Sequence, residues 1–127
     1  MSQTRIGRLK ARHQFLKIAN EGHKAVTKSF VIFCCFDFIS TQRDVFQKND
    51  ILIGYTATKK VGNAVKRNRM KRRLRAMMYE SFIGDFNPVF QKAGFVVIAR
   101  HNAFKTPYAE MKAELSKCAN WLRKQAG

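Results

Sequence analysis

Acidic residues are scarce in this chain. Its 127 residues include 8 Asp and Glu against 25 Lys and Arg, which gives a formal net charge of +17. The acids are scattered and show no DxD or HxE spacing of the kind that holds catalytic metal ions. The three histidines, His13, His23 and His101, are not spaced as a general acid–base pair. We therefore predict no metal site and no catalytic residue on the protein itself.

Cysteines and long apolar runs are also few. Cys34, Cys35 and Cys118 are an odd number without CxxC or Cys/His spacing, which argues against a disulfide framework and against a zinc site. We therefore expect a reducing compartment, the cytoplasm. The apolar stretch Phe30–Ile39 is interrupted by Asp37 and is shorter than the roughly 18 residues that span a bilayer. No membrane partner is expected, and the charge makes a small-molecule substrate a poor fit.

The two Pro and seven Gly are thinly spread, so no linker or repeat divides the chain, and we expect one domain over residues 1–127. Periodicity predicts two helices, Leu9–Ala19 and Ala64–Phe82, and a last helix with Thr106 as its N-cap and Pro107 at its first position. The predicted strands are Ser29–Phe38, Ile51–Lys60 and Phe95–Ala99, and an extended segment near Lys24–Val26 would add another. The predicted order is α, two or three strands, then α, β, α.

The most informative stretch is strongly basic. From Lys59 to Arg75 there is no acid, and the nine cations are Lys59, Lys60, Lys66, Arg67, Arg69, Lys71, Arg72, Arg73 and Arg75. At 100° per residue, the helix that Asn63 caps carries an apolar stripe of Met70, Leu74, Met77 and Ser81. One flank of the stripe consists of Arg67, Lys71 and Arg75, and the other of Lys66, Arg69 and Arg73. We predict that the helix docks by its stripe and holds cations on both sides.

This concentration of charge indicates a polyanionic partner, with nucleic acid as the leading class. Cations in the first helical turns oppose the helix dipole, and a merely solvated face would mix both signs of charge. We predict a phosphate site that is formed by Lys59, Lys60 and the free N–H groups after Asn63. We include Asn68 in this site. A DNA-reading helix is an alternative, but nine cations with two Asn suit contact with a nucleic-acid backbone better.

The segment Ile51–Lys60 alternates with period two. Its first set of side chains is apolar and consists of Ile51, Ile53, Tyr55 and Ala57. Its second set is small and hydroxylated, ends in a cation, and consists of Leu52, Gly54, Thr56, Thr58 and Lys60. Such a face is rarely pure core. We therefore expect an open sheet face at this position.

The basic stretch, KKVGNAVKRNRMKRRLR, resembles the signature of the bacterial ribonuclease P protein subunit, whose centre is Arg67-Asn68-Arg69. Further segments stand in the order of that family: Arg8-Leu9-Lys10 with Phe15, residues 30–33, Gly54, Val96 to Arg100, and Tyr108-Ala109-Glu110. The resemblance implies an α+β single domain of the order α-β-β-β-α-β-α. It also implies the architecture of the second domain of ribosomal protein S5, with a left-handed βαβ crossover.

The resemblance further implies an accessory protein of an endoribonuclease. In that family the RNA subunit, with bound Mg²⁺, hydrolyses the phosphodiester that joins the 5′ leader to precursor tRNA, and the protein itself binds no cofactor. The expected partners are therefore ribonuclease P RNA and the single-stranded leader. We predict that the RNA subunit is held by Lys66, Arg69, Arg72, Arg73 and Arg75.

The family binds the leader in a cleft between the first helix and the sheet. The matching positions in this chain are Phe15, Phe33, Thr56, Thr58, Lys60, Arg67 and Lys71. Both Phe residues are interpreted as stacking platforms for bases, although ordinary core positions would show the same pattern. Where the family commonly has a second aromatic residue on the first helix, this chain has Ala19, so one base stack is expected to be missing. A ribosomal or other structural RNA-binding protein is the alternative function that composition allows.

Overall fold

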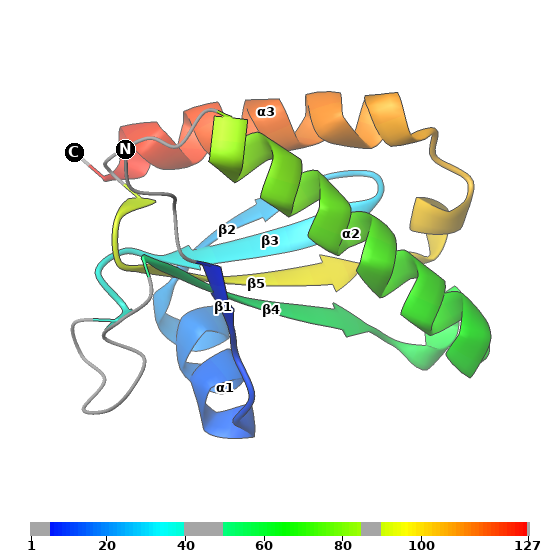
Figure 1. The fold of residues 1–127 in the computed structure, drawn as a ribbon, viewed down its shortest axis with the longest axis horizontal. Coiled ribbons are helices and arrows are strands. Elements are labelled where there is room, and N and C mark those ends of the chain that lie inside the picture. Colours follow the sequence, from blue (N-terminus) through cyan, green and yellow to red (C-terminus); the bar gives the residue numbers. More distant parts are fainter. Residues whose placement is uncertain (1–5, 40–49, 85–89, 127) are drawn as a thin grey trace.

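A five-stranded mixed sheet organises the computed structural model, which describes residues 6–39, 50–84 and 90–126 (Figure 1). The strands are β1 (Ile6–Arg8), β2 (His23–Val26), β3 (Phe30–Cys35), β4 (Ile51–Ala57) and β5 (Ala93–Ala99). The helices are α1 (Arg12–Glu21), α2 (Ala64–Gly84) and α3 (Tyr108–Gln125), with short 3-10 turns η3 (Lys59–Val61) and η5 (His101–Phe104). The strand order is β1-β4-β5-β3-β2, in which β4 pairs in parallel with β1 and β5, and the other pairs are antiparallel.

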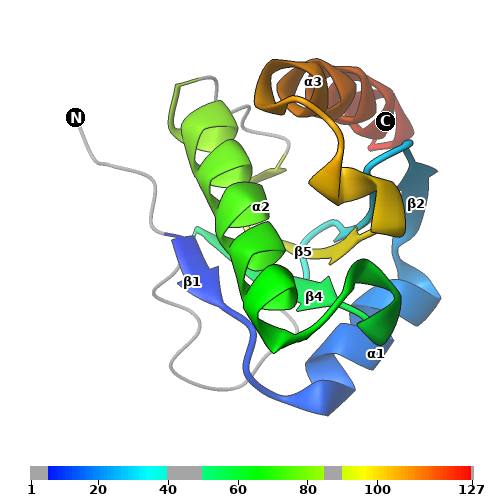
Figure 2. The ribbon, with the colours of Figure 1, turned by 90° about the vertical axis from the view of Figure 1, so that its right-hand side faces the viewer.

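The helices cover the two faces of the sheet unequally. Helices α2 and α3 lie on one face and α1 on the other (Figure 2). The stripe residues Met70, Leu74 and Met77 of α2 are buried in the larger core, as predicted, whereas the Ser81 side chain lies outside the described residues. On the opposite face, Ile18 of α1 joins a smaller apolar cluster that includes Val96. One face is therefore well covered, and the other is only partly covered.

Strand β3 shows how the sequence produces two cores. Its side chains alternate between fully buried and half-buried, because Phe30, Ile32 and Cys34 face α2 and α3. Phe33 and Cys35 instead pack against the smaller cluster beneath α1. The predicted mixed α+β domain is confirmed, and so is the left-handed crossover of β4–α2–β5. In Figure 1 both strands point to the right, β5 lies above β4, and α2 passes in front of them.

Several predicted boundaries were wrong because local patterns do not report where a chain turns. The strand predicted to reach Phe38 ends at Cys35, where the chain turns through Asp37 with a φ of 58°. The strand predicted to reach Lys60 ends at Ala57 and continues as η3. The first helix begins at Arg12, since the Leu9 N–H still donates to the carbonyl of Ile53 at 3.1 Å.

Two further differences concern the first strand and the start of the last helix. Strand β1 was not predicted, because three residues carry no usable periodicity and it forms only by pairing with β4. Thr106 was predicted as the N-cap of the last helix, but Pro107 occupies that position. The Pro107 backbone is extended, with a ψ of 145°, so the helix begins one residue later at Tyr108.

Candidate nucleic-acid interface

The turn from β4 into α2 fixes the start of the basic helix. Gly62 adopts a φ of +145°, which side chains other than glycine's rarely allow, and a Cβ there would lie 2.7 Å from Cδ of Lys66. The next residue, Asn63, accepts the Lys66 backbone N–H through its Oδ1 atom at 2.9 Å. The predicted N-cap is therefore confirmed. It occupies one of the N–H groups that the predicted phosphate site would otherwise offer.

Asn63→Ala should lower the free energy of unfolding by about 1 kcal/mol, because it removes this cap from α2. Thermal unfolding of the two proteins measures the loss. The matched control is Asn68→Ala, since Asn68 is exposed within the same helix and alanine is the better helix former. Equal destabilisation by both changes would contradict the capping role.

The two predicted flanks of α2 face different surroundings. On one flank, the Lys66 ammonium and the Arg69 guanidinium lie over the Phe104 ring of η5, 5.4 and 5.9 Å from its centroid. On the other flank, the Arg75 guanidinium lies over the Tyr55 ring of β4 at 5.5 Å. Arg75 was predicted to act with Arg69 on the RNA subunit. The structure places it instead with Lys71, on the side of the sheet's β4 edge.

Arg73 has an internal role that the sequence did not reveal. Its Nη1 donates to the carbonyl of Ala103 at 2.9 Å, and its Nη2 donates to the carbonyl of Thr106 at 2.7 Å. These two bonds tie α2 to the segment that leads into α3. The side chain is half-buried, so part of its donor capacity is directed inward rather than to an RNA backbone.

We expect Arg73→Ala to destabilise the fold by about 2 kcal/mol, in the range of charge-assisted hydrogen bonds. Arg72→Ala is the matched control, because Arg72 is its exposed neighbour on the outward face of α2. Urea unfolding measured on both variants checks the difference. An Arg73→Ala protein as stable as the Arg72→Ala protein would show that the two bonds contribute little.

At the other end of the interface, Phe15 of α1 lies against β4. A Cβ on Gly54 would lie 2.4 Å from Cε1 of Phe15, so only glycine lets the ring approach the strand this closely. The half-buried ring borders two hollows. The first has a volume of about 210 Å³ and is lined by Arg8, Leu9, Lys10, Phe15, Ile53, Tyr55, Lys71 and Arg75. The second has a volume of about 400 Å³ and is lined by Lys10, Arg12, Phe15, Leu16 and Thr56.

The first hollow is suited to bind an anion. It contains four cations, from β1, the following loop and α2, and none of its lining residues is acidic. Burial raises the pKa of the Tyr55 phenol, so the ring beside Arg75 stays uncharged at neutral pH. Within the described structure, the Nε atom of Arg75, which lines this hollow, is a buried donor without a hydrogen-bond partner, and so is the Nε atom of Arg67, on the same flank of α2 but outside the hollow. An acceptor such as a phosphate oxygen would remove the cost of leaving these donors unbonded.

Beyond Phe15, the sheet face is open. Strand register aligns Thr56, Ile98, Val31 and Val26 in one row across β4, β5, β3 and β2. The first three are half-buried and Val26 is exposed, because α1 lies over the other end of the sheet, with Ile18 against Gly94. Phe33 belongs to the neighbouring row, where the Lys24 ammonium lies 5.8 Å from its ring centroid.

The structure thus brings together some of the predicted leader residues. Phe15, Thr56 and Lys71 border the two hollows, and Phe33 packs against the same apolar cluster as Phe15. Thr58 and Lys60 are exposed at η3, and Ala19 is half-buried on α1. Asn68, which was predicted to share a phosphate site with Asn63, lies on α2, five residues beyond Asn63. It lines a shallow hollow of about 400 Å³ with Val65, Lys71, Arg72 and Arg75.

Sequence reasoning missed three residues of this interface. Arg8 and Lys10 belong to the family pattern but were not assigned a binding role, and Tyr55 was placed with the apolar set of β4. Tyr55 does point to that face. However, β1 ends at Arg8, whose partner on β4 is Ile53, so β1 does not extend alongside Tyr55 and the ring lies at the uncovered edge of β4. The polar hydroxyl of Tyr55 was the available signal.

Other chemistries find little support in the described residues. No group of three or more His, Cys, Asp or Glu in this part of the chain lies close enough to hold a metal ion. Burial raises the pKa of the Cys34 thiol, and it raises the pKa of the Cys118 thiol to about 11, so both are protonated at neutral pH. Over the same residues, none of the helices has the length and apolarity needed to span a membrane.

Comparison with known proteins gives a consistent result. A family model described as Ribonuclease P matches residues 4–123. The ribonuclease P protein component of Bacillus pumilus is 32% identical over 108 residues, covering 85% of this chain and 81% of that protein. The component from Syntrophus aciditrophicus is 34% identical over 111 residues, covering 85% and 80%.

Solved structures agree with the fold. The RNase P protein of Staphylococcus aureus superposes with a TM-score of 0.63 at 26% identity, covering 94% of each chain. The RNase P protein of Thermotoga maritima gives a TM-score of 0.66 at 23% identity, covering 92% of this chain and 96% of that one, and supports the fold alone.

Proposed function

The chain belongs to the ribonuclease P protein family, and we propose that it assists the RNA subunit of this endoribonuclease in removing the 5′ leader from precursor tRNA. In this proposal the protein acts in the cytoplasm and contributes binding rather than chemistry. Mg²⁺ is assigned to the RNA subunit, because the carboxylates of the described residues do not cluster into a set of metal ligands.

The observation that carries the proposal is the continuous basic and aromatic surface from α2 to Phe15. Lys71 and Arg75 of α2 and Phe15 of α1 line one hollow, and from Phe15 the open row leads across the sheet. Cations that bind phosphates beside an aromatic ring that stacks on bases are typical of single-stranded nucleic-acid sites. We assign this surface to the leader, with Arg67 and Arg75 on the α2 side and Thr56 and Phe33 on the sheet.

The RNA subunit is assigned to the opposite flank and the outward face of α2. Lys66, Arg69 and Arg72 are exposed there, and no ion pair to an acid is found for them among the described residues. Their charge is therefore available to RNA phosphates, which supply most of the affinity of such interfaces. Arg73 contributes mainly by holding α2 in place.

Reconstitution tests the proposal directly. Purified protein added to a bacterial ribonuclease P RNA at low Mg²⁺ should stimulate cleavage of precursor tRNA at the leader junction, and the protein alone should cleave nothing. Gel analysis of the 5′ products measures both results. Binding of RNA without stimulation would instead favour a structural RNA-binding protein. Cleavage by RNA-free protein, abolished by changing one of its own acids, would overturn the accessory role.

A further inference from the structure

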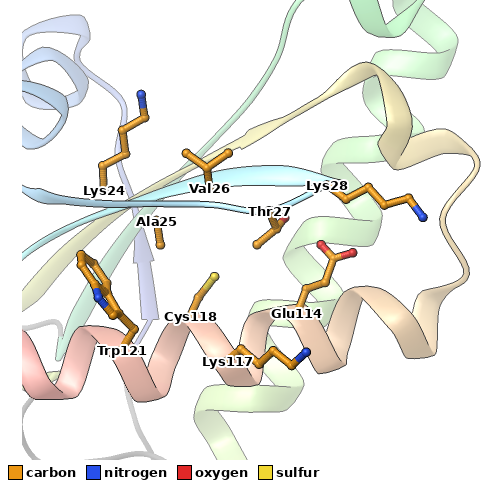
Figure 3. Close-up of a pocket in the computed structure, with 9 residues that line it drawn as sticks. All are labelled: Lys24, Ala25, Val26, Thr27, Lys28, Glu114, Lys117, Cys118 and Trp121. Atoms are coloured by element: carbon orange, nitrogen blue, oxygen red, sulfur yellow. The ribbon is translucent and has the colours of Figure 1, made fainter.

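A fourth hollow lies at the edge of the sheet formed by β2, where the strand faces α3 (Figure 3). Its volume is about 540 Å³, and residues 24–28 line it together with Glu114, Lys117, Cys118 and Trp121 of α3. Trp121 is the only Trp of the chain, and its side chain is 43% exposed. In Figure 3 the indole projects from α3 toward the strand. An exposed aromatic ring in a concave site is suited to stack on a planar ligand.

The charges around this hollow favour an anion. Three of its lining residues are Lys and one is acidic, and that acid is already bonded. The Glu114 carboxylate accepts the backbone N–H of Ser29 at 3.4 Å and the hydroxyl of Ser29 at 3.3 Å. Lys28 forms an exposed ion pair with Glu110 at 3.4 Å, whereas Lys24 and Lys117 have no acidic partner among the described residues. Two lysine charges therefore remain for a ligand.

The hollow lies round the β2 edge from the open face proposed for the leader, because α3 covers the opposite face of the sheet. Val26, the last residue of the row that begins at Thr56, lines it and is 56% exposed. Lys24 also lines it and at the same time lies over the Phe33 ring. The row crosses three strand spacings, about 14 Å in total. In Figure 3, Lys24 and Val26 point away from α3, so a chain that leaves Phe15 along this row reaches Trp121 by turning round the edge of β2.

We propose that a single-stranded RNA leader crosses the open row, contacts Lys24 with one phosphate, and turns round the β2 edge, beyond which a distal nucleobase stacks on Trp121 and a further phosphate contacts Lys117. Stacking and phosphate contacts of this kind are tolerant of sequence. The inference rests on the proposed function, because it extends the path assigned there to the leader. A long leader therefore makes one additional contact with the protein, which a short leader does not reach.

An acidic peptide is the competing occupant. The Thr27 N–H donates to the Phe30 carbonyl at 2.8 Å, so by alternation the backbone groups of Lys24 and Val26 point away from β3. Such an edge could pair with an added strand. The row that ends at the same edge, the lysine charges that are unpaired in the described structure and the exposed indole favour RNA, and fluorescence titration separates the two occupants.

The single Trp makes the test direct, because intrinsic fluorescence reports on this site alone. Protein assembled with ribonuclease P RNA is titrated with precursor tRNAs whose leaders lengthen one nucleotide at a time. Quenching should appear only once the leader reaches the β2 edge. Trp121→Ala should weaken binding of long-leader substrates about tenfold, the size of one base–aromatic stack, and leave short-leader substrates unchanged. Trp121→Phe should restore most of the affinity.

The matched control is Tyr79→Ala, which removes an exposed aromatic residue of α2 that lines none of the four hollows described above. It should cause no loss that depends on leader length. Circular dichroism of each variant verifies that the fold is retained.

Three results would overturn the inference: no quenching at any leader length, quenching by mature tRNA to the same extent, or normal long-leader binding by Trp121→Ala. Quenching by an acidic peptide but not by RNA would assign the edge to a protein partner. In all these cases stimulation of cleavage at low Mg²⁺ would persist if the proposed function is right. Absence of that stimulation in the unmodified protein would instead refute the proposed function.

Discussion

Replacing Arg69 and Arg72 together by Ala should weaken assembly of the protein with ribonuclease P RNA by roughly tenfold or more and leave the fold intact. Both residues are exposed on α2, and a hydrogen bond to a charged phosphate contributes about 1.5–3 kcal/mol. The log–log slope of affinity against salt should also become shallower by about two units, one for each phosphate that the variant no longer neutralises. Fluorescence anisotropy of labelled RNA over a salt series measures both quantities.

The control for this change removes the same net charge elsewhere. Arg123→Ala with Lys124→Ala takes two exposed cations from the last turn of α3. This pair should reduce affinity much less, because general attraction to a polyanion is shared among many charges of a chain with a net charge of +17. An equal loss from both double variants would mean that α2 forms no specific interface with the RNA subunit.

Phe33→Leu should weaken binding of precursor tRNA to the assembled complex by about 1–3 kcal/mol, the contribution of one base–aromatic stack. Leucine keeps apolar volume in the cluster beneath α1, where Phe33 is half-buried, but provides no ring for a base. Mature tRNA lacks the leader and should bind equally well to both proteins. Equilibrium binding of the two tRNA forms to each complex gives the comparison.

Phe30→Leu is the matched control for Phe33→Leu. Phe30 lies on the same strand but is fully buried on the opposite face, against α2 and α3. Its replacement should lower the unfolding temperature without favouring one tRNA form over the other. If Phe33→Leu behaved in the same way, weakening both tRNA forms alike or unfolding the protein, Phe33 would be a core residue and would not belong to the leader surface.

The basic helix was the part of the molecule most accessible to sequence reasoning. A period of 3.6 residues is a local property, so the apolar stripe and the two cationic flanks followed from spacing alone, and Met70, Leu74 and Met77 are buried as expected. The cap at Asn63 is equally local, since donor and acceptor are three residues apart. Strand β3 was also predicted, from its content of Phe, Val and Ile, although its end was not.

Other features depend on contacts between distant segments. Nothing near β1 predicts a strand, because its three residues become one only by pairing with β4, more than forty positions later. The flank positions of Arg73 and Arg75 were predicted, but their partners were not. The carbonyls that accept from Arg73 belong to the segment around η5, and the ring beneath Arg75 belongs to β4. The five residues predicted to hold the RNA subunit are therefore divided between two sides of α2.

The sequence by itself determined the charge, the basic helix with its two flanks and the resemblance to the ribonuclease P family, because composition and short-range periodicity are independent of how the chain turns back on itself. Only the tertiary structure decided which of those cations meet an aromatic surface. The strand order β1-β4-β5-β3-β2 places Phe15 on Gly54, opens the row from Thr56 to Val26, and brings α3 to the free edge of β2. These positions arise from pairing and packing between residues far apart in the chain, for which a single sequence carries no local signal.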